Sequence, residues 1–243
     1  LECYPTGHDG RHHTLGQETD PGLINAFPRI VVFLMASKNI QRPAAQPRFM
    51  VSQLVECVPN ISEGRNLAVI ESIVDVVRQT SGCTVLGVEP DHDYNRTVIT
   101  FAGEPECVMR GAIELIKASV EHLDMRLHKG EHPRLGVVDV CPFVPLKGIT
   151  MEACAELARE VVDALSLELD VPLFLYGAAA SSKERVMLSD LRRGEYEGLE
   201  ARLSEGPCDH NEFTRLPDRG AIEWNETVAK SGGITVGARP ILV

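Results

Sequence analysis

The chain has 243 residues, 44% of them hydrophobic, and a formal net charge of -11 from 35 acidic and 24 basic side chains. This length suits one large domain, or one domain with appendages. The acidic balance argues against a nucleic-acid surface, and an anionic ligand would need a local cluster of cations. The N-terminal apolar run at residues 30–36 is far shorter than the ~20 residues that span a bilayer, so we expect no membrane partner.

The seven cysteines lie far apart and form no CxxC pair. Several of them stand inside apolar runs, where a free thiol behaves as a small hydrophobic side chain. The pattern predicts neither a disulfide framework nor a zinc ribbon. It favours a reducing compartment, and we therefore expect a cytoplasmic protein.

Residues 1–49 begin with Leu, mix Gly, His, Pro and Gln, and have no sustained hydrophobic period. They are predicted to be a disordered or non-native N-terminal extension. Folding is expected to begin at Met50, because residues 51–58 have the pattern of a strand that ends in a Pro-Asn turn. Residues 62–66 are helix-start residues, and the apolar stripe after them predicts a first helix that stops at Gly82.

Two β-rich runs, 83–88 and 97–102, are joined by a polar loop and predict an antiparallel pair of strands. Pro105 suits the first turn of a second helix, whose apolar stripe runs to Leu123. Residues 135–144 are almost continuously apolar, as in a strand buried within a sheet. The order β-α-β-β-α-β predicts an α+β fold with a ferredoxin-like split βαβ sheet and its helices on one face.

Further elements extend this arrangement. The sequence predicts a third helix at 154–165, another strand at 171–176, and a helical stretch at 186–203 that is broken near its middle. Residues 204–233 are irregular and rich in charge, Gly and Pro, which is typical of a linker or a ligand-facing loop. The chain ends inside an apolar run at 234–243. Natural domains seldom stop within a strand, so we expect truncation at this point.

The turn His128–Arg134 holds two imidazoles, two cations and a carboxylate around a Gly and a Pro. Histidine can take and return a proton near neutrality, and nearby cations can hold an anion. Taken alone, such a turn is more often a solvated connection than a catalytic site. Its histidines, with Glu131 and His122, would alternatively bind a hydrolytic metal. Gly130 and Pro133 disfavour the helix that would place both rings on one face, so no metal is predicted.

An ordered series of motifs resembles the N-terminal subdomain of the glutamate formiminotransferase family, closely over about residues 50–203 and less closely beyond. The motifs are Leu54–Asn66, Asn95–Val98, His128–Arg134, Asp139–Phe143, Leu175–Gly177 and Arg193–Glu197. The resemblance divides the chain into that subdomain at 50–203, a linker or folate-facing loop at 204–233, and the start of a truncated C-terminal subdomain at 234–243. It implies transfer of the formimino group from N-formimino-L-glutamate to tetrahydrofolate, the co-substrate, in histidine degradation.

In that family the His before the Pro of the turn is the catalytic acid/base, and it corresponds to His132 here. Attack by N5 of the folate leaves an extra proton on the incoming nitrogen, while the departing glutamate nitrogen must gain one. One imidazole can perform both transfers in sequence. Pro133 restricts the backbone of His132 to extended conformations, which helps to aim the ring. His128 either supports the turn, is solvated, or takes part directly.

Both substrates are polyanions, so cations within the matched motifs are candidate contacts, with surface solubility as the alternative for each. These cations are Arg65, Arg96, Lys129 and Arg134. Asn60 and Asn95 are predicted to give amide hydrogen bonds to the substrate, or else they close turns. Glu89 stands where the family tends to carry an acidic residue. It would orient His132 or protonate the leaving group, unless it is an ordinary strand-end Glu.

The segment Gly220–Gly232 corresponds roughly to the part of the family that links two subdomains and contacts folate, although its length departs from the family pattern. The implied folate-binding residues are Gly220, Trp224 and Gly232. Trp224 would stack on a pterin or benzoyl ring, or it packs over a subdomain edge instead.

From the resemblance, we expect the chain to lack most of the second subdomain, which forms one wall of the folate cleft in the family, and the cyclodeaminase domain of the bifunctional animal enzymes. Weak folate binding would limit turnover, because catalysis needs both reactants held together. The second hypothesis is therefore a non-catalytic folate- or partner-binding module. The exposed face of a lone subdomain also predicts a homo-oligomer or association with a second subdomain.

Overall fold

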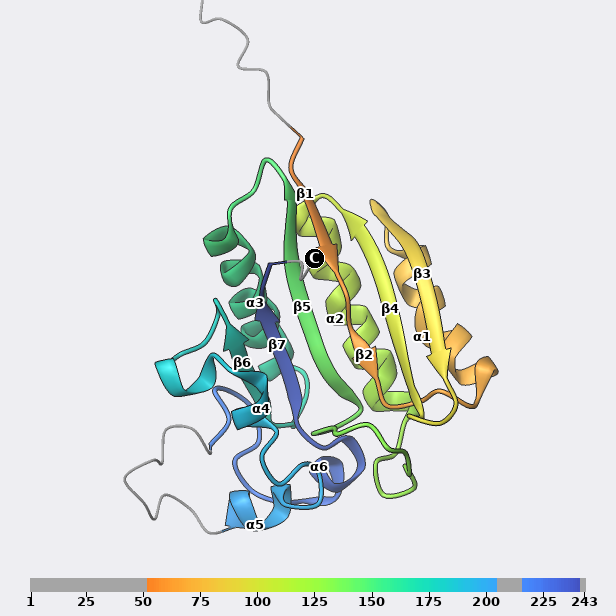
Figure 1. Ribbon diagram of the computed structural model, residues 1–243, viewed down its shortest axis with the longest axis vertical. Coiled ribbons are helices and arrows are strands. Elements are labelled where there is room, and N and C mark those ends of the chain that lie inside the picture. Colours follow the sequence, from red (N-terminus) through yellow and green to blue (C-terminus); the bar gives the residue numbers. More distant parts are fainter. Residues whose placement is uncertain (1–51, 205–215, 241–243) are drawn as a thin grey trace, which may run out of the picture. The chain divides into compact units, whose positions relative to one another are not determined.

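One mixed sheet of seven strands organises the residues that the computed structural model describes, 52–204 and 216–240 (Figure 1). The predicted extension at 1–49 lies outside the described residues. The strands are β1 (Leu54–Cys57), β2 (Asn60–Ile61), β3 (Cys83–Asp91), β4 (Arg96–Gly103), β5 (Val138–Lys147), β6 (Leu173–Gly177) and β7 (Ile234–Ala238). The α+β class is therefore confirmed.

β1 and β2 follow one another along the same line of the sheet, and both pair antiparallel with β4 on one side and β5 on the other. Pro59 separates them, because a proline has no N–H to give to the sheet. β3 pairs antiparallel with β4 at the edge. The predicted strand at 51–58 thus contains β1, and Asn60 of the predicted Pro-Asn turn is already the first residue of β2.

β7 lies between β5 and β6 and runs parallel to both. All five of its residues are buried, as expected of a strand in the parallel part of a sheet. This strand includes five of the ten residues 234–243 that the sequence assigns to the start of a second subdomain. In the structure these five residues complete the sheet formed by the preceding residues.

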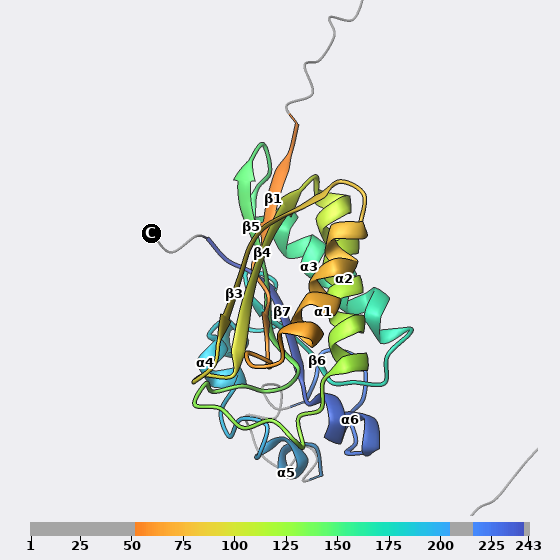
Figure 2. The same cartoon turned by 90° about the vertical axis from the view of Figure 1, so that its right-hand side faces the viewer.

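Three long helices cover one face of the sheet, as Figure 2 shows. They are α1 (Leu67–Gln79), α2 (Pro105–His122) and α3 (Met151–Ser166). Their apolar stripes pack against the sheet in the main core, together with large buried side chains such as Phe101 and Phe143. Asn66 caps α1 by accepting a hydrogen bond from the Val69 amide, which satisfies one of the free N–H groups of the first turn. All three helices match the predicted ones.

Shorter elements follow β6 and build a second, smaller core. They are a 3₁₀ turn (Lys183–Arg185), α4 (Leu188–Leu191), α5 (Leu199–Ser204) and α6 (Glu226–Ser231). The predicted helical stretch at 186–203 is thus two helices separated around Gly194, whose φ is 88°. α4 lies on the side of the sheet opposite the long helices (Figure 2). No helix in the described ranges is long and apolar enough to cross a membrane.

Candidate active site

The segment between α2 and β5 carries the predicted turn, and Asn95 ties it to two other loops. The Asn95 side chain accepts a hydrogen bond from the Gly64 amide at 2.9 Å and donates one to the Lys129 carbonyl at 3.1 Å. Gly130 passes so close to Tyr94 that a Cβ would lie 2.3 Å from its carbonyl oxygen. The Asn95 amide is thus used within the protein, which favours the turn-closing interpretation of this residue.

His132 lies at the inner side of the turn, with 13% of its side chain exposed. Its Nδ1 is 3.8 Å from Oδ2 of Asp139, and the Tyr94 ring meets it edge-on with 6.2 Å between the ring centroids. Burial lowers the pKa of His132 to about 4, and the positive charges of Arg96 and Arg192 act in the same direction. The ring is therefore uncharged at neutral pH and able to accept a proton.

Asp139 is a part of the site that the sequence prediction missed. It is 1% exposed, its Oδ1 accepts hydrogen bonds from the Leu135 amide at 3.1 Å and from Arg192 Nε at 2.9 Å, and its Oδ2 accepts one from Arg192 Nη2. Burial raises the pKa of Asp139 to about 6. The sequence does contain a signal for this residue, because Asp139 is an acidic residue inside the apolar run 135–144. A carboxylate buried in such a run requires a hydrogen-bond or ion-pair partner.

Arg96 is a cation near His132 and Asp139 that makes no ion pair among the described residues. It is half-buried, and its guanidinium carbon lies 5.8 Å from the centroid of the Tyr94 ring. Its Nε is buried without a hydrogen-bond partner, and among the described residues its guanidinium makes no ion pair. A buried unpaired donor costs about 1–3 kcal/mol, which an anionic ligand would recover. His132 and Arg96, two of the predicted site residues, thus both contact the Tyr94 ring.

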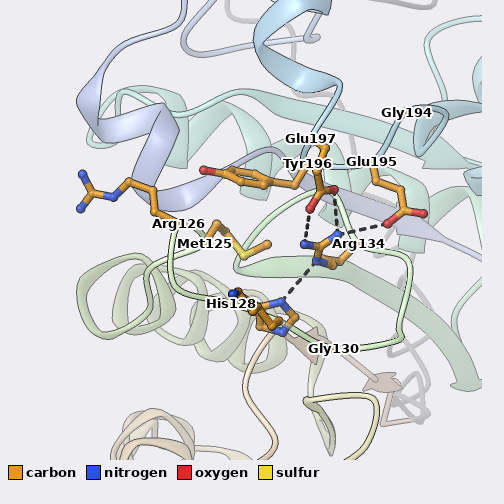
Figure 3. Close-up of a pocket in the computed structure, with 10 residues that line it drawn as sticks. Met125, Arg126, His128, Gly130, Arg134, Gly194, Glu195, Tyr196 and Glu197 are labelled. Carbon is orange, nitrogen blue, oxygen red and sulfur yellow. Dashed lines mark hydrogen bonds and ion pairs between the residues drawn. The ribbon is translucent and has the colours of Figure 1, made fainter.

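The opposite side of the turn borders a pocket of about 720 Å³ (Figure 3). Its lining consists of Met125, Arg126, His128, Lys129, Gly130, Arg134, Gly194, Glu195, Tyr196 and Glu197. The buried Arg134 donates to both carboxylate oxygens of Glu197, at 2.9 and 2.6 Å, and to Glu195 at 3.1 Å. This predicted substrate contact is already neutralised by two carboxylates.

His128 has both of its ring nitrogens engaged. Its Nε2 lies 2.8 Å from the Asn95 carbonyl oxygen, and Arg134 Nε donates to its Nδ1 at 3.3 Å. These partners require the neutral tautomer with the proton on Nε2, because a carbonyl only accepts and a guanidinium only donates. Burial also lowers the pKa of His128. The geometry favours a supporting role in the turn.

The other predicted substrate contacts differ in how far their side chains are exposed. Arg65 is exposed, and its Nε donates to the His92 carbonyl at 2.9 Å. Asn60 is half-buried on β2, opposite Val140 of β5. Glu89 and Lys129 are both exposed. Asn60 is thus next to Asp139 in the sheet, and the two exposed side chains are open to solvent.

Each of the three predicted folate contacts has a packing role. Gly220 and Gly232 have φ values of 78° and 65°, and a Cβ on either would lie within 2.4 Å of a backbone oxygen. Trp224 is half-buried and packs against the Tyr196 ring, with 6.0 Å between the ring centroids. These contacts favour the edge-packing interpretation of Trp224. No group of three or more His, Cys, Asp or Glu in the described ranges is arranged to hold a metal ion.

An uncharged histidine beside a buried carboxylate and an unpaired arginine defines a site for proton transfer next to an anion. It is carried by an α+β domain with three helices on one face of the sheet. Residues 54–239 match the family described as the formiminotransferase domain, N-terminal subdomain. The chain belongs to this family, and the resemblance of its motifs is confirmed.

Curated relatives from animals, bacteria and archaea share this region. The chain is 44% identical over 193 residues to the formimidoyltransferase-cyclodeaminase of Rattus norvegicus, which covers 79% of this chain and 34% of the relative. It is 39% identical over 193 residues to the glutamate formimidoyltransferase of Streptococcus pyogenes serotype M1, covering 79% and 61% of the two chains. The glutamate formimidoyltransferase of Thermoplasma acidophilum is 38% identical over 192 residues, with 78% and 60% covered. The chain thus spans about a third of the animal relative.

Proposed function

We propose that this chain takes part in transferring the formimino group from N-formimino-L-glutamate to tetrahydrofolate, a step of histidine degradation in the cytoplasm. The observation that carries the proposal is His132, uncharged at neutral pH and beside the unpaired cation Arg96. The names of the relatives, formimidoyltransferase-cyclodeaminase and glutamate formimidoyltransferase, supply the substrate class.

The proposed chemistry assigns proton transfer to His132. Its neutral imidazole takes the extra proton from N5 of the folate after N5 has attacked the formimino carbon. The resulting imidazolium returns a proton to the glutamate nitrogen as the carbon–nitrogen bond to that nitrogen breaks. Positioned proton transfer of this kind contributes about 10²- to 10⁴-fold in rate.

Arg96 is proposed to bind a carboxylate of the formimino donor. A guanidinium can hold a carboxylate through two parallel hydrogen bonds, and the Arg96 Nε is a buried donor without a protein acceptor. A bound carboxylate would also offset the repulsion that Arg96 exerts on protonated His132. The pKa of His132 would then move from about 4 toward neutrality. An acid/base with a pKa near the working pH both takes and returns protons efficiently.

The remaining assignments stay predictions. Asn60, Arg65, Glu89 and Lys129 are proposed substrate contacts, and Gly220, Trp224 and Gly232 are proposed folate contacts. We also propose a ferredoxin-like split βαβ arrangement for the first half of the sheet, supported by the antiparallel neighbours β3-β4-β1-β5. The division at residue 203 stays a prediction too, and the pairing of β7 with β5 and β6 favours grouping β7 with residues 50–203.

The second candidate is a non-catalytic folate- or partner-binding module. It is supported by the family match, which is to an N-terminal subdomain over residues 54–239. A second subdomain or a second copy of the chain would then complete the cleft.

Turnover separates the two candidates. The full 243-residue chain is incubated with N-formimino-L-glutamate and tetrahydrofolate, and released glutamate is measured in the steady state. We expect release that depends on tetrahydrofolate and is lost in His132→Asn. Folate binding in equilibrium dialysis, combined with no release above the level of that variant, would instead establish the binding module.

A further inference from the structure

We infer that Asp139 and Arg192 are positioning residues that hold the proton of neutral His132 on Nδ1 and leave Nε2 free to accept the substrate proton. The inference deepens the proposed function and rests on it for the catalytic part. It concerns two residues that are not among the predicted site residues.

The sheet register explains how Asp139 reaches His132. Asn60 of β2 pairs with Val140 and the next residue, Ile61, pairs with Val138, so Asp139 of β5 has no partner on β2. One extra residue on one strand of an antiparallel pair is a β-bulge, which re-aims a side chain and is common beside active sites. The main chain is held there because Thr235 Oγ1 of β7 donates to the Asp139 carbonyl at 2.5 Å.

Arg192 fixes the Asp139 carboxylate in one orientation. The guanidinium donates from Nε to Oδ1 at 2.9 Å and from Nη2 to Oδ2, the two-pronged geometry that suits an arginine–carboxylate pair. Oδ1 also accepts from the Leu135 amide. Oδ2 therefore has one arginine donor and is the oxygen nearest His132 Nδ1, at 3.8 Å.

This geometry selects one tautomer of His132. An ionised carboxylate only accepts hydrogen bonds, whereas a neutral imidazole has one N–H and one lone pair. The favourable arrangement places the N–H on Nδ1 toward Asp139. The distance of 3.8 Å is longer than a hydrogen bond, and such contacts often shorten only when substrate binds. A buried aspartate has the same relation to histidine in the Ser-His-Asp triad.

The role of Arg192 follows from the burial of its partner. Asp139 is 1% exposed, and without a cation a carboxyl group in that position would become protonated. It would then act as a donor and could favour the other tautomer. Arg192 is the C-cap residue of α4, so the packing of α4 against the sheet sets the position of the guanidinium.

His128 gives an internal reference, because its partners require the opposite tautomer with the proton on Nε2. Long-range ¹H–¹⁵N correlation spectra of the ¹⁵N-labelled full chain at pH 7 distinguish the two tautomers of each ring. His128→Asn and His132→Asn assign the signals. We expect the wild-type chain to carry the proton on Nδ1 in His132 and on Nε2 in His128.

Asp139→Asn tests the inference directly. Its side-chain amide can donate to Nδ1, so we expect the His132 proton to move to Nε2 while the His128 tautomer stays unchanged. We also expect kcat to fall about 10²- to 10⁴-fold with a much smaller change in KM, because the ring remains present in the wrong tautomer. Arg192→Lys keeps the cation and loses the two-pronged contact, so a smaller loss of kcat is expected.

Asp218→Asn is the matched control. Asp218 is also a buried aspartate, 6% exposed at its side chain, and it pairs with Arg185 Nη1 at 2.5 Å away from the turn. Asp218→Asn breaks the ion pair with Arg185, just as Asp139→Asn breaks the ion pair with Arg192. Each variant leaves a largely buried arginine without that carboxylate and should therefore lose stability. We expect lower resistance to urea in both variants, and a changed His132 tautomer in Asp139→Asn alone.

A His132 proton on Nε2 in the wild-type chain would overturn the inference, and so would an unchanged tautomer in folded Asp139→Asn. If Asp139→Asn does not fold, the wild-type tautomer still decides. These spectra need no turnover. If the chain has the expected tautomers but releases no glutamate, the positioning role is supported and the proposed activity is rejected. If the chain releases glutamate but His132 has the opposite tautomer, the proposed activity is supported and the positioning role is rejected.

Discussion

The two sides of the turn His128–Arg134 contain the same residue types and differ in their partners. On each side a histidine stands beside an arginine: His128 beside Arg134, and His132 beside Arg96. On one side, His128 and Arg134 bond to each other, and the arginine is neutralised by Glu195 and Glu197. On the other side, His132 has no hydrogen bond to its ring, and Arg96 makes no ion pair, among the described residues. Available donors and acceptors, rather than residue type, therefore indicate where a ligand can bind.

The largest expected difference comes from replacing each histidine by asparagine. His132→Asn should lower kcat for formimino transfer about 10²- to 10⁴-fold, because asparagine cannot take up a proton near neutrality. His128→Asn should lower it only a few-fold, since both ring nitrogens of His128 are already bonded within the turn. Steady-state release of glutamate measures both. Equal losses in two folded variants would contradict the distinction between the two sides.

The second-largest expected effect is a pH dependence of the free energy of unfolding that comes from the lowered pKa of His132. Its folded pKa is about 4, whereas a histidine in an unfolded chain titrates near 6.5. Between these values the unfolded chain binds more protons, so the free energy of unfolding falls as the pH falls from about 6.5 to about 4. His132→Asn lacks this loss. Over that window the wild-type chain should therefore lose about 2–3 kcal/mol relative to the variant.

Urea unfolding of both proteins at several pH values between 7 and 4 measures this difference. The raised pKa of Asp139 acts in the opposite direction, because the folded state then binds the extra proton below about pH 6. That contribution is present in both proteins and cancels to first order. Parallel stability curves across the window would show that His132 is not held neutral by the fold.

Much of the fold follows from local patterns. The stripes of α1, α2 and α3 and Pro105 at the start of α2 are visible in the sequence, because one face of each helix must be apolar to cover the sheet. The start of β5 is less predictable. Residues 135–137 are apolar like the strand, but they contact the end of α6, where the Val137 amide donates to the Ser231 carbonyl. Apolar sequence alone does not distinguish these two kinds of burial.

The candidate site also has a part that the sequence predicts and a part that only the tertiary structure shows. His132 and Arg96 lie in motifs that the sequence displays, and the structure brings them together. The bulge at Asp139 depends on the register of two strands that are far apart in sequence. Arg192 and Glu197 reach the site from segments more than fifty residues away, so their contacts come from tertiary packing. No short-range pattern could have shown that Arg134 is neutralised and Arg96 is not.

Replacing Arg96, the proposed carboxylate contact beside His132, by lysine should weaken substrate binding. Arg96→Lys is expected to raise KM for N-formimino-L-glutamate about tenfold, equivalent to about 1.4 kcal/mol, because lysine cannot form the two-pronged carboxylate contact. Resistance to urea should not fall, since Arg96 makes no ion pair to lose among the described residues. An unchanged KM with reduced stability would place Arg96 among the structural residues.

Among the changes in the turn and at Arg96, the smallest expected effect is that of Arg134→Lys on the free energy of unfolding. Lysine keeps the charge but loses the contacts to both oxygens of Glu197 and the bond to His128 Nδ1. The Glu195 and Glu197 side chains are 42% and 62% exposed and stay hydrated after the change. The free energy of unfolding should therefore fall by only about 1 kcal/mol.

Arg159→Lys provides the control for Arg134→Lys, because Arg159 also pairs with two glutamates, Glu152 and Glu156, but on the exposed side of α3. Urea unfolding should give a loss below about 0.5 kcal/mol for this variant. Equal losses in the two variants would remove the special role of Arg134 in the turn. A rise in KM for Arg134→Lys larger than that for Arg96→Lys would mean that Arg134 exchanges its glutamates for the substrate carboxylate, and that the anion binds on the pocket side of the turn.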